Sequence, residues 1–155
     1  MYKTIVAARV RGIFAEINRG NYGAMIDGLA TPFEYRFLGD HPLSGRRTRV
    51  STMDLWWQRI FRLLPDAQFT LHEVIVQGHP LNTRIAVRST ISTRLPSGVS
   101  YSNDVMQFMR LRLGKLTHVE TMEDTAKFER YLATLDHAAY PDAIAPPLDD
   151  EPVSS

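Results

Sequence analysis

Two alternating runs on either side of a tight turn constrain the fold of this 155-residue chain more than any other feature. Apolar and polar side chains alternate over residues 101–113 and again over residues 116–122, with Gly114 and Lys115 between them. Period-two alternation predicts strands that bury one face, and a turn this short predicts that they pair antiparallel. A helix over residues 124–135 follows at once, with apolar side chains at helical spacing. Two long paired strands that lead into a helix predict a curved wall, and therefore a pocket beneath it.

The rest of the chain supplies helices to cover that wall. Apolar periodicity and cap residues predict helices over residues 4–18, 22–29 and 51–64, and strands over residues 33–38, 68–77 and 83–94. Thr31 and Pro32 should end the second helix, and Ser51 with Asp54 forms a capping-box pattern at the start of the third. The order α-α-β-α-β-β-β-β-α predicts the α+β class, with helices gathered on one face of an antiparallel sheet.

Length and composition predict a single domain, which we place over residues 1–139. The acidic, proline-rich tail, residues 140–155, should be weakly ordered or pack on a neighbouring subunit. No apolar run is long enough to span a membrane, and Arg9 and Arg11 interrupt the first apolar stretch too early for a signal peptide. These features predict a cytoplasmic protein without a membrane partner. The net charge of +1 gives no case for a nucleic-acid partner.

Three segments resemble the nuclear transport factor 2-like superfamily, and within it the SnoaL-like and ketosteroid-isomerase-like branches. They are residues 15–25 (AEINRGNYGAM), 37–47 (FLGDHPLSGRR) and 111–116 (LRLGKL). The resemblance implies a cone-shaped fold, in which a curved sheet wraps around the N-terminal helices and a ligand cavity opens at the wide end. It also implies a homodimer packed through the convex face of the sheet. The sequence agrees, because Met106 and Phe108 place apolar side chains on the face of their strand away from the pocket.

Two carboxylates are the candidate catalytic groups. Asp40, with His41 beside it, lies where the isomerase branch carries the carboxylate that shuttles a proton; the alternative is that Asp40 caps a turn in a solvent-exposed loop. A gapless alignment places Phe37, not Asp40, at the position of the base. Asp124 matches the acidic position that serves as acid and base in SnoaL-like cyclases, and its alternative role is the N-cap of the helix that follows.

The resemblance to the steroid isomerases does not extend to their oxyanion hole. Their tyrosine aligns near Ile13, and their protonated aspartate aligns near Gln107. Without a fixed pair of strong donors the charge of an enolate would go largely unstabilised, so steroid isomerisation is disfavoured.

Apolar and polar residues from several segments should line the pocket. The predicted ligand-binding residues are Tyr35, Phe37, Trp56, Asn103, Gln107 and Val119. The length of the turn at Gly114 decides which face of the last strand points into the pocket, and the sequence allows two lengths. A three-residue turn with a bulge turns Val119 and Thr121 towards Gln107, whereas a two-residue turn turns His118 and Glu120 inward instead.

No metal or cofactor is expected. The five histidines, His41, His72, His79, His118 and His137, show no metal-ligand spacing, and no nucleotide-binding glycine pattern occurs.

The sequence thus predicts a small-molecule-binding, SnoaL-like protein that takes a small apolar or polycyclic ligand. As an enzyme it would be a cofactor-independent isomerase, cyclase or dehydratase that uses carboxylate acid/base chemistry on an apolar carbonyl or polycyclic substrate. The alternatives are a non-catalytic ligand carrier or sensor, and a dimeric assembly domain. The cavity discriminates among them, because only catalysis requires ionisable groups within it.

Overall fold

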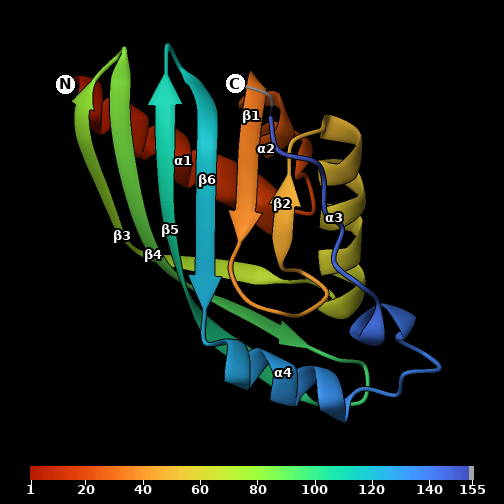
Figure 1. The fold of residues 1–155 in the computed structure, drawn as a ribbon. Helices are drawn as coiled ribbons and strands as arrows, with labels where there is room; N and C mark the ends of the chain where they lie inside the picture. The colour runs from red at the N-terminus through yellow and green to blue at the C-terminus, as the bar shows by residue number, and fades with distance from the viewer. Residues whose placement is uncertain (154–155) are drawn as a thin grey trace.

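Six strands form one curved sheet in the computed structural model, which describes residues 1–153 (Figure 1). The strands are β1 (Leu29–Phe37), β2 (Gly45–Arg47), β3 (Gln68–His79), β4 (Asn82–Arg94), β5 (Ser100–Arg112) and β6 (Lys115–Glu123). Their spatial order is β2-β1-β6-β5-β4-β3. All neighbours pair antiparallel except β1 and β6, which run parallel. The curved sheet is confirmed, but it is mixed and not wholly antiparallel, because β1 joins the edge of β6 without a hairpin between them.

Four α-helices and one short 3-10 helix accompany the sheet. They are α1 (Tyr2–Asn18), α2 (Gly23–Asp27), α3 (Val50–Leu63), α4 (Thr125–Thr134) and the 3-10 helix η1 (Pro141–Ile144). Figure 1 shows α1 behind the strands, α3 beside β2, and α4 beneath the end of β6. The predicted α+β class and order are confirmed, with β2 and η1 as additions. No helix among the described residues is long and apolar enough to cross a membrane.

Two element boundaries differ from the prediction. The second helix ends at Asp27, and strand β1 begins at Leu29 and continues through Pro32, where we expected a break. Leu29 pairs with Leu116 of β6 at the start of this extended segment, so the tertiary contact overrides the local helical pattern.

The turn between β5 and β6 has two residues, Leu113 and Gly114, both with positive φ. Positive φ at both central residues is typical of the tight hairpin turn that matches the twist of the flanking strands. The register shifts after the pairs Arg112–Lys115 and Leu111–Leu116, so that Thr117 is an extra residue in β6. The turn is therefore the shorter of the two alternatives, and a bulge lies within the strand.

This bulge decides which face of β6 is inward. Gln107 pairs with Thr121, and both side chains are buried. Val119 is buried beside them, whereas His118 and Glu120 are exposed. Of the two alternatives left open by the sequence, the structure has Val119 and Thr121 facing the interior.

The interior is formed by one face of the sheet and the apolar stripes of α1 and α3. Helix α1 buries Val6, Val10, Phe14 and Ile17. Strands β4 and β5 alternate between buried and exposed residues along nearly their whole length. Each large apolar side chain buried in this way stabilises the fold by about 1.5–3 kcal/mol.

Candidate functional site

A narrow cavity of about 70 Å³ lies between the sheet and helices α1 and α3. Its walls are mostly apolar, and they include Phe14 of α1, Trp56 and Trp57 of α3, and Met109 and Val119 of the sheet. A single water needs about 10–15 Å³, so this space is larger than one or two solvent molecules require. An apolar cavity with few polar groups is the usual form of a small-molecule site.

Three polar side chains meet on one wall of the cavity. The Nε2 of Gln107 donates to the Oγ1 of Thr121 at 2.9 Å and to the hydroxyl of Tyr35 at 3.3 Å. Burial raises the pKa of the Tyr35 phenol, so this hydroxyl keeps its proton at neutral pH. The Oε1 of Gln107 is buried and has no hydrogen-bond partner among the described residues. The cluster can therefore both donate to a ligand and accept from one.

Glu123 places a carboxyl group in the wall of this cavity. It ends β6 opposite the buried Val105, and its side chain forms part of the cavity wall. Its Oε1 is buried without a hydrogen-bond partner among the described residues. Burial, with a smaller contribution from the neighbouring Asp124 carboxylate, raises the pKa of Glu123 to about 8. A carboxyl group with a pKa near neutrality is suited to both giving and taking a proton.

Glu123 is not among the predicted site residues, although the alternation along its strand contains a signal for it. Alternation along β6 puts Val119, Thr121 and Glu123 on the same face. Because the direction of that face was unresolved, the acidic residue at its end could not be assigned to the cavity.

Asp40 and Asp124 lie outside the cavity wall. Asp40 is exposed in the loop between β1 and β2. The Oδ1 of Asp124 accepts a hydrogen bond from the backbone N–H of Lys127 at 3.1 Å, which is the N-cap role that we gave as its alternative. The predicted catalytic role of these two carboxylates finds no support in these positions.

His41 is buried, but it does not line the cavity either. Its ring meets Phe37 and Phe128 edge-on, at centroid distances of 5.0 Å and 4.9 Å. Its Nδ1 accepts from the backbone N–H of Leu43 at 3.2 Å. Burial lowers the pKa of His41 to about 4, so the ring is neutral at neutral pH. In this position the ring supports the loop that precedes β2.

Of the six predicted ligand-binding residues, five line the cavity: Tyr35, Phe37, Trp56, Gln107 and Val119. Asn103 is buried outside it. The Nδ2 of Asn103 donates to the Tyr101 hydroxyl and to the backbone oxygen of Asp124, both at 2.9 Å. Asn103 therefore ties β5 to the start of α4.

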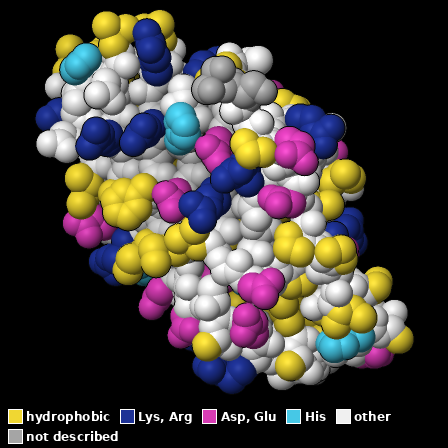
Figure 2. Space-filling model, in the orientation of Figure 1, with side chains coloured by type: hydrophobic (Ala, Val, Ile, Leu, Met, Phe, Trp, Pro, Cys, Tyr) yellow, Lys and Arg dark blue, Asp and Glu magenta, His cyan; other side chains and the backbone are white. Residues whose placement is uncertain are grey.

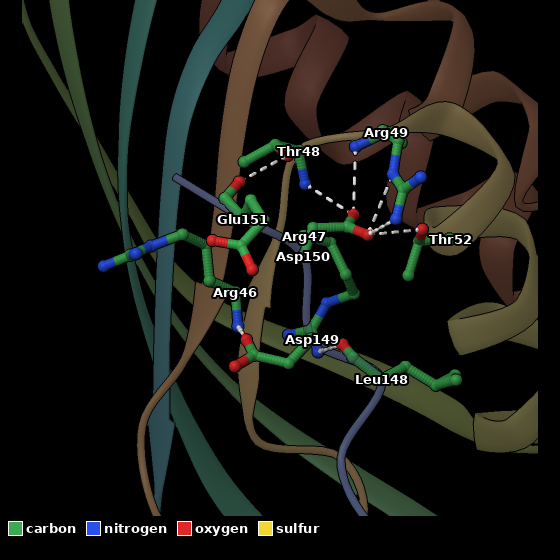
Figure 3. Close-up of polar contacts among 9 residues, drawn as sticks. All are labelled: Arg46, Arg47, Thr48, Arg49, Thr52, Leu148, Asp149, Asp150 and Glu151. Atoms are coloured by element: carbon green, nitrogen blue, oxygen red, sulfur yellow. Dashed lines mark hydrogen bonds and ion pairs between the residues drawn. The ribbon is translucent and has the colours of Figure 1, made fainter. Parts of the chain in front are cut away.

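A buried arginine supports the aromatic wall from behind. The guanidinium of Arg47 lies 4.8 Å from the centre of the Trp56 ring. Its Nη1 donates to the backbone oxygens of Ser44 and Leu148, both at 3.0 Å. Leu148 belongs to the C-terminal segment, so that segment helps to fix Arg47 against the cavity wall (Figure 3).

The same segment supplies hydrogen-bond acceptors to the backbone at the N-terminus of α3. The Oδ2 of Asp150 accepts from the backbone N–H groups of Thr48 and Arg49, at 2.9 Å and 3.2 Å. Its Oδ1 accepts from the Nη2 of Arg49 at 2.7 Å and from the Oγ1 of Thr52 at 2.9 Å. Figure 3 shows these contacts converging on one carboxylate. The tail that we expected to be weakly ordered or to lie on a neighbour thus packs on its own chain.

Within residues 1–153, no three His, Asp or Glu side chains lie close enough together to hold a metal ion.

A family model described as a SnoaL-like domain matches residues 10–119. The chain belongs to the SnoaL-like domain family. The resemblance read from the three sequence segments is therefore confirmed. No curated protein sequence matches the chain.

Several solved structures share the fold of this chain. TerC, co-crystallised with polyporic acid, has a TM-score of 0.70 at 18% identity over 82% of this chain and 97% of its own. An NTF2-like protein of unknown function from Burkholderia pseudomallei has a TM-score of 0.70 at 17% identity, over 80% of this chain and 94% of its own. IdmH, a putative polyketide cyclase from Streptomyces antibioticus, has a TM-score of 0.65 at 18% identity, over 82% and 97%. At these identities the likeness establishes the NTF2-like fold.

Proposed function

We propose that this SnoaL-like protein binds an apolar carbonyl compound and catalyses proton transfer on it without a cofactor, as an isomerase, cyclase or dehydratase does. The observation that carries the proposal is the carboxyl group of the half-buried Glu123, whose Oε1 is buried without a hydrogen-bond partner among the described residues and which lines the cavity. A buried carboxyl group without a structural partner destabilises a fold, so its retention favours a chemical role.

The neighbouring groups fit this chemistry. Glu123 would remove a proton from a carbon next to the carbonyl group and return it elsewhere on the ligand. The Tyr35 hydroxyl accepts from Gln107, which leaves its own proton for Thr121 or for the carbonyl oxygen of a ligand. A phenol that donates to this oxygen stabilises the negative charge that develops as the proton leaves. The apolar walls exclude water, which strengthens each of these interactions.

Two of the similar structures support a small-molecule role. IdmH is a putative polyketide cyclase, and TerC was co-crystallised with polyporic acid. By analogy with these proteins, the cavity of this chain would hold an organic ligand.

Proton abstraction from nitrobenzisoxazole tests the proposal without knowledge of the natural substrate. A base that removes the carbon-bound proton opens the ring of this compound and releases a coloured phenolate. We expect the wild-type protein to accelerate the reaction, with a rate that rises with pH to a plateau and has its midpoint near about 8, the pKa of Glu123. The variant Glu123→Gln should lose about 10²- to 10⁴-fold in rate, the usual contribution of a general base.

Asp40→Asn is the matched control, because it removes an exposed carboxylate outside the cavity. It should keep the rate and the pH profile of the wild type. Equal rates for the wild type and Glu123→Gln, or loss of activity in Asp40→Asn alone, would refute the assignment of Glu123 as the base.

Ligand carriage is the second candidate function. It is favoured by the lining of the cavity, which is apolar apart from Arg9, Tyr35, Gln107, Thr121 and Glu123. A carrier would retain a ligand through purification and release it chemically unchanged. Native mass spectrometry identifies the ligand, and chromatography of the ligand extracted before and after incubation distinguishes the two functions, because only an enzyme changes the mass or the isomeric form of its ligand.

A further inference from the structure

Arg9 marks the place where the cavity meets solvent. It is exposed, whereas every other residue that lines the cavity is buried or half-buried. Its Nη1 donates to the backbone oxygen of Gly114 at 2.7 Å, so the guanidinium reaches from α1 to the turn between β5 and β6. A ligand that enters at this end passes beside a positive charge.

The charge of Arg9 is not neutralised by the protein. Among the described residues, Arg9 makes no ion pair with a carboxylate. A guanidinium has five N–H donors, and the contact with Gly114 engages Nη1 alone. Lys115, next to that turn, also lacks an ion pair there, and its Nζ donates to the backbone oxygen of Asp27 at 2.6 Å. The rim thus offers unused donors and positive charge to an anion.

The wall of the cavity behind this rim is long. The residues of α1 that line it run from Val6 to Ile17, which is about 16 Å along the helix at about 1.5 Å per residue. On β6 the lining residues run from Leu116 to Glu123, which is about 23 Å at about 3.3 Å per residue. The apolar wall is therefore long enough for an extended chain.

We propose that the ligand is an elongated apolar carboxylic acid, whose carboxylate binds Arg9 at the rim and whose chain extends towards Tyr35, Gln107 and Thr121. The pairing of guanidinium with carboxylate is planar and charge-assisted, which makes it a specific contact at the mouth of an otherwise apolar cavity. The inference rests on the proposed function only in that it concerns the same cavity. It assigns the class of ligand and names Arg9 as the residue that selects it.

Decanoate and decanol test this proposal, because they share one chain length and differ in the charged group. Trp56 and Trp57 both line the cavity and are the two tryptophans of the chain, so their fluorescence reports its occupancy. We expect the wild type to bind decanoate about tenfold more tightly than decanol, the factor given by one charge-assisted hydrogen bond of about 1.4 kcal/mol. Raising the salt concentration should narrow this preference.

Arg9→Met should remove the preference and leave the affinity for decanol unchanged. Arg11→Met is the matched control, since Arg11 is exposed on the same helix and does not line the cavity. It should keep the preference. Equal binding of the two compounds by the wild type, or a preference that survives in Arg9→Met, would overturn the role of Arg9. No fluorescence response to either compound would overturn the ligand class, while the nitrobenzisoxazole assay would still decide the role of Glu123.

Discussion

Glu123 and Asp124 are neighbours in the chain, yet their carboxyl groups lie in different surroundings. Strand β6 ends at Glu123, whose side chain turns into the cavity, and α4 begins directly after Asp124, whose side chain accepts the Lys127 N–H. The Oε1 of Glu123 has no hydrogen-bond partner among the described residues, whereas the carboxylate of Asp124 caps α4. At the residue scale, the candidate chemistry therefore depends on where the strand stops and the helix starts.

The raised pKa of Glu123 predicts how stability changes with pH. Between the usual value of 4.5 and the folded value of about 8, the folded protein holds a proton that the unfolded chain has released. The contribution of Glu123 is thus most favourable below 4.5 and is lost as the pH rises to about 8, with a slope of at most about 1.4 kcal/mol per pH unit. Glu123→Gln should remove this loss.

Urea denaturation of the wild type and Glu123→Gln, at several pH values across this window, measures the effect. The free energy of unfolding of the variant, relative to that of the wild type, should increase as the pH rises. Two parallel pH profiles would show that Glu123 titrates normally in the folded state.

The residues of the cavity wall could be predicted where periodicity fixes their direction. Trp57 and Gln107 lie on the buried faces that the helical and alternating patterns indicated. Asp40 lies in a loop, where no repeating pattern ties a side chain to the core. Glu123 depended on the register of β6, which the bulge at Thr117 sets and which the sequence left open.

At the scale of elements, the N-terminus of α3 shows a limit of local sequence patterns. The expected capping box of Ser51 and Asp54 is absent, since Asp54 instead accepts from the Tyr22 hydroxyl and the Gln58 amide, each at 2.8 Å. The carboxylate that serves the helix start is Asp150, which is 102 residues beyond Thr48. A capping residue so far along the chain cannot be recognised from the sequence close to the start of α3.

Asp150→Ala should destabilise the fold by about 1–3 kcal/mol. The substitution leaves the N–H groups of Thr48 and Arg49 without their acceptor, and unsatisfied donors near a helix start carry a cost of this size. Thermal or urea denaturation measures the change. Glu151→Ala is the control, because Glu151 contributes its backbone oxygen to Thr48. A loss in Glu151→Ala as large as in Asp150→Ala would show that the carboxylate of Asp150 is not the anchor.

At the scale of the whole molecule, the order of elements could be predicted because the apolar periodicity of each segment indicates whether it is a helix or a strand. The parallel pairing of β1 with β6 could not, since these strands are separated in the chain by α3 and the four other strands of the sheet. Strands so distant in sequence are paired by the tertiary fold as a whole, and no local sequence pattern specifies that pairing.

The convex face of the sheet carries exposed apolar side chains and charges of both signs. Phe108 is 62% exposed, and Ile75 is 53% exposed. Both line a groove of about 550 Å³, together with charged residues of both signs: Glu34, Arg36, Arg84, Arg110 and Glu120. Figure 2 shows hydrophobic side chains set among positive and negative ones on this side of the molecule. A twofold interface must be complementary to itself, and a patch with both charges around an apolar centre satisfies that condition.

We therefore predict a homodimer through this face, as the family resemblance implied. Phe108→Arg should convert the dimer to a monomer, because two copies of the new charge would meet in an apolar contact. Sedimentation equilibrium of the wild type and the variant measures the mass directly. Leu55→Arg is the control, since Leu55 is 51% exposed on α3 and the substitution should leave the dimer intact. A monomeric wild type, or a dimer that persists in Phe108→Arg, would exclude this face as the interface.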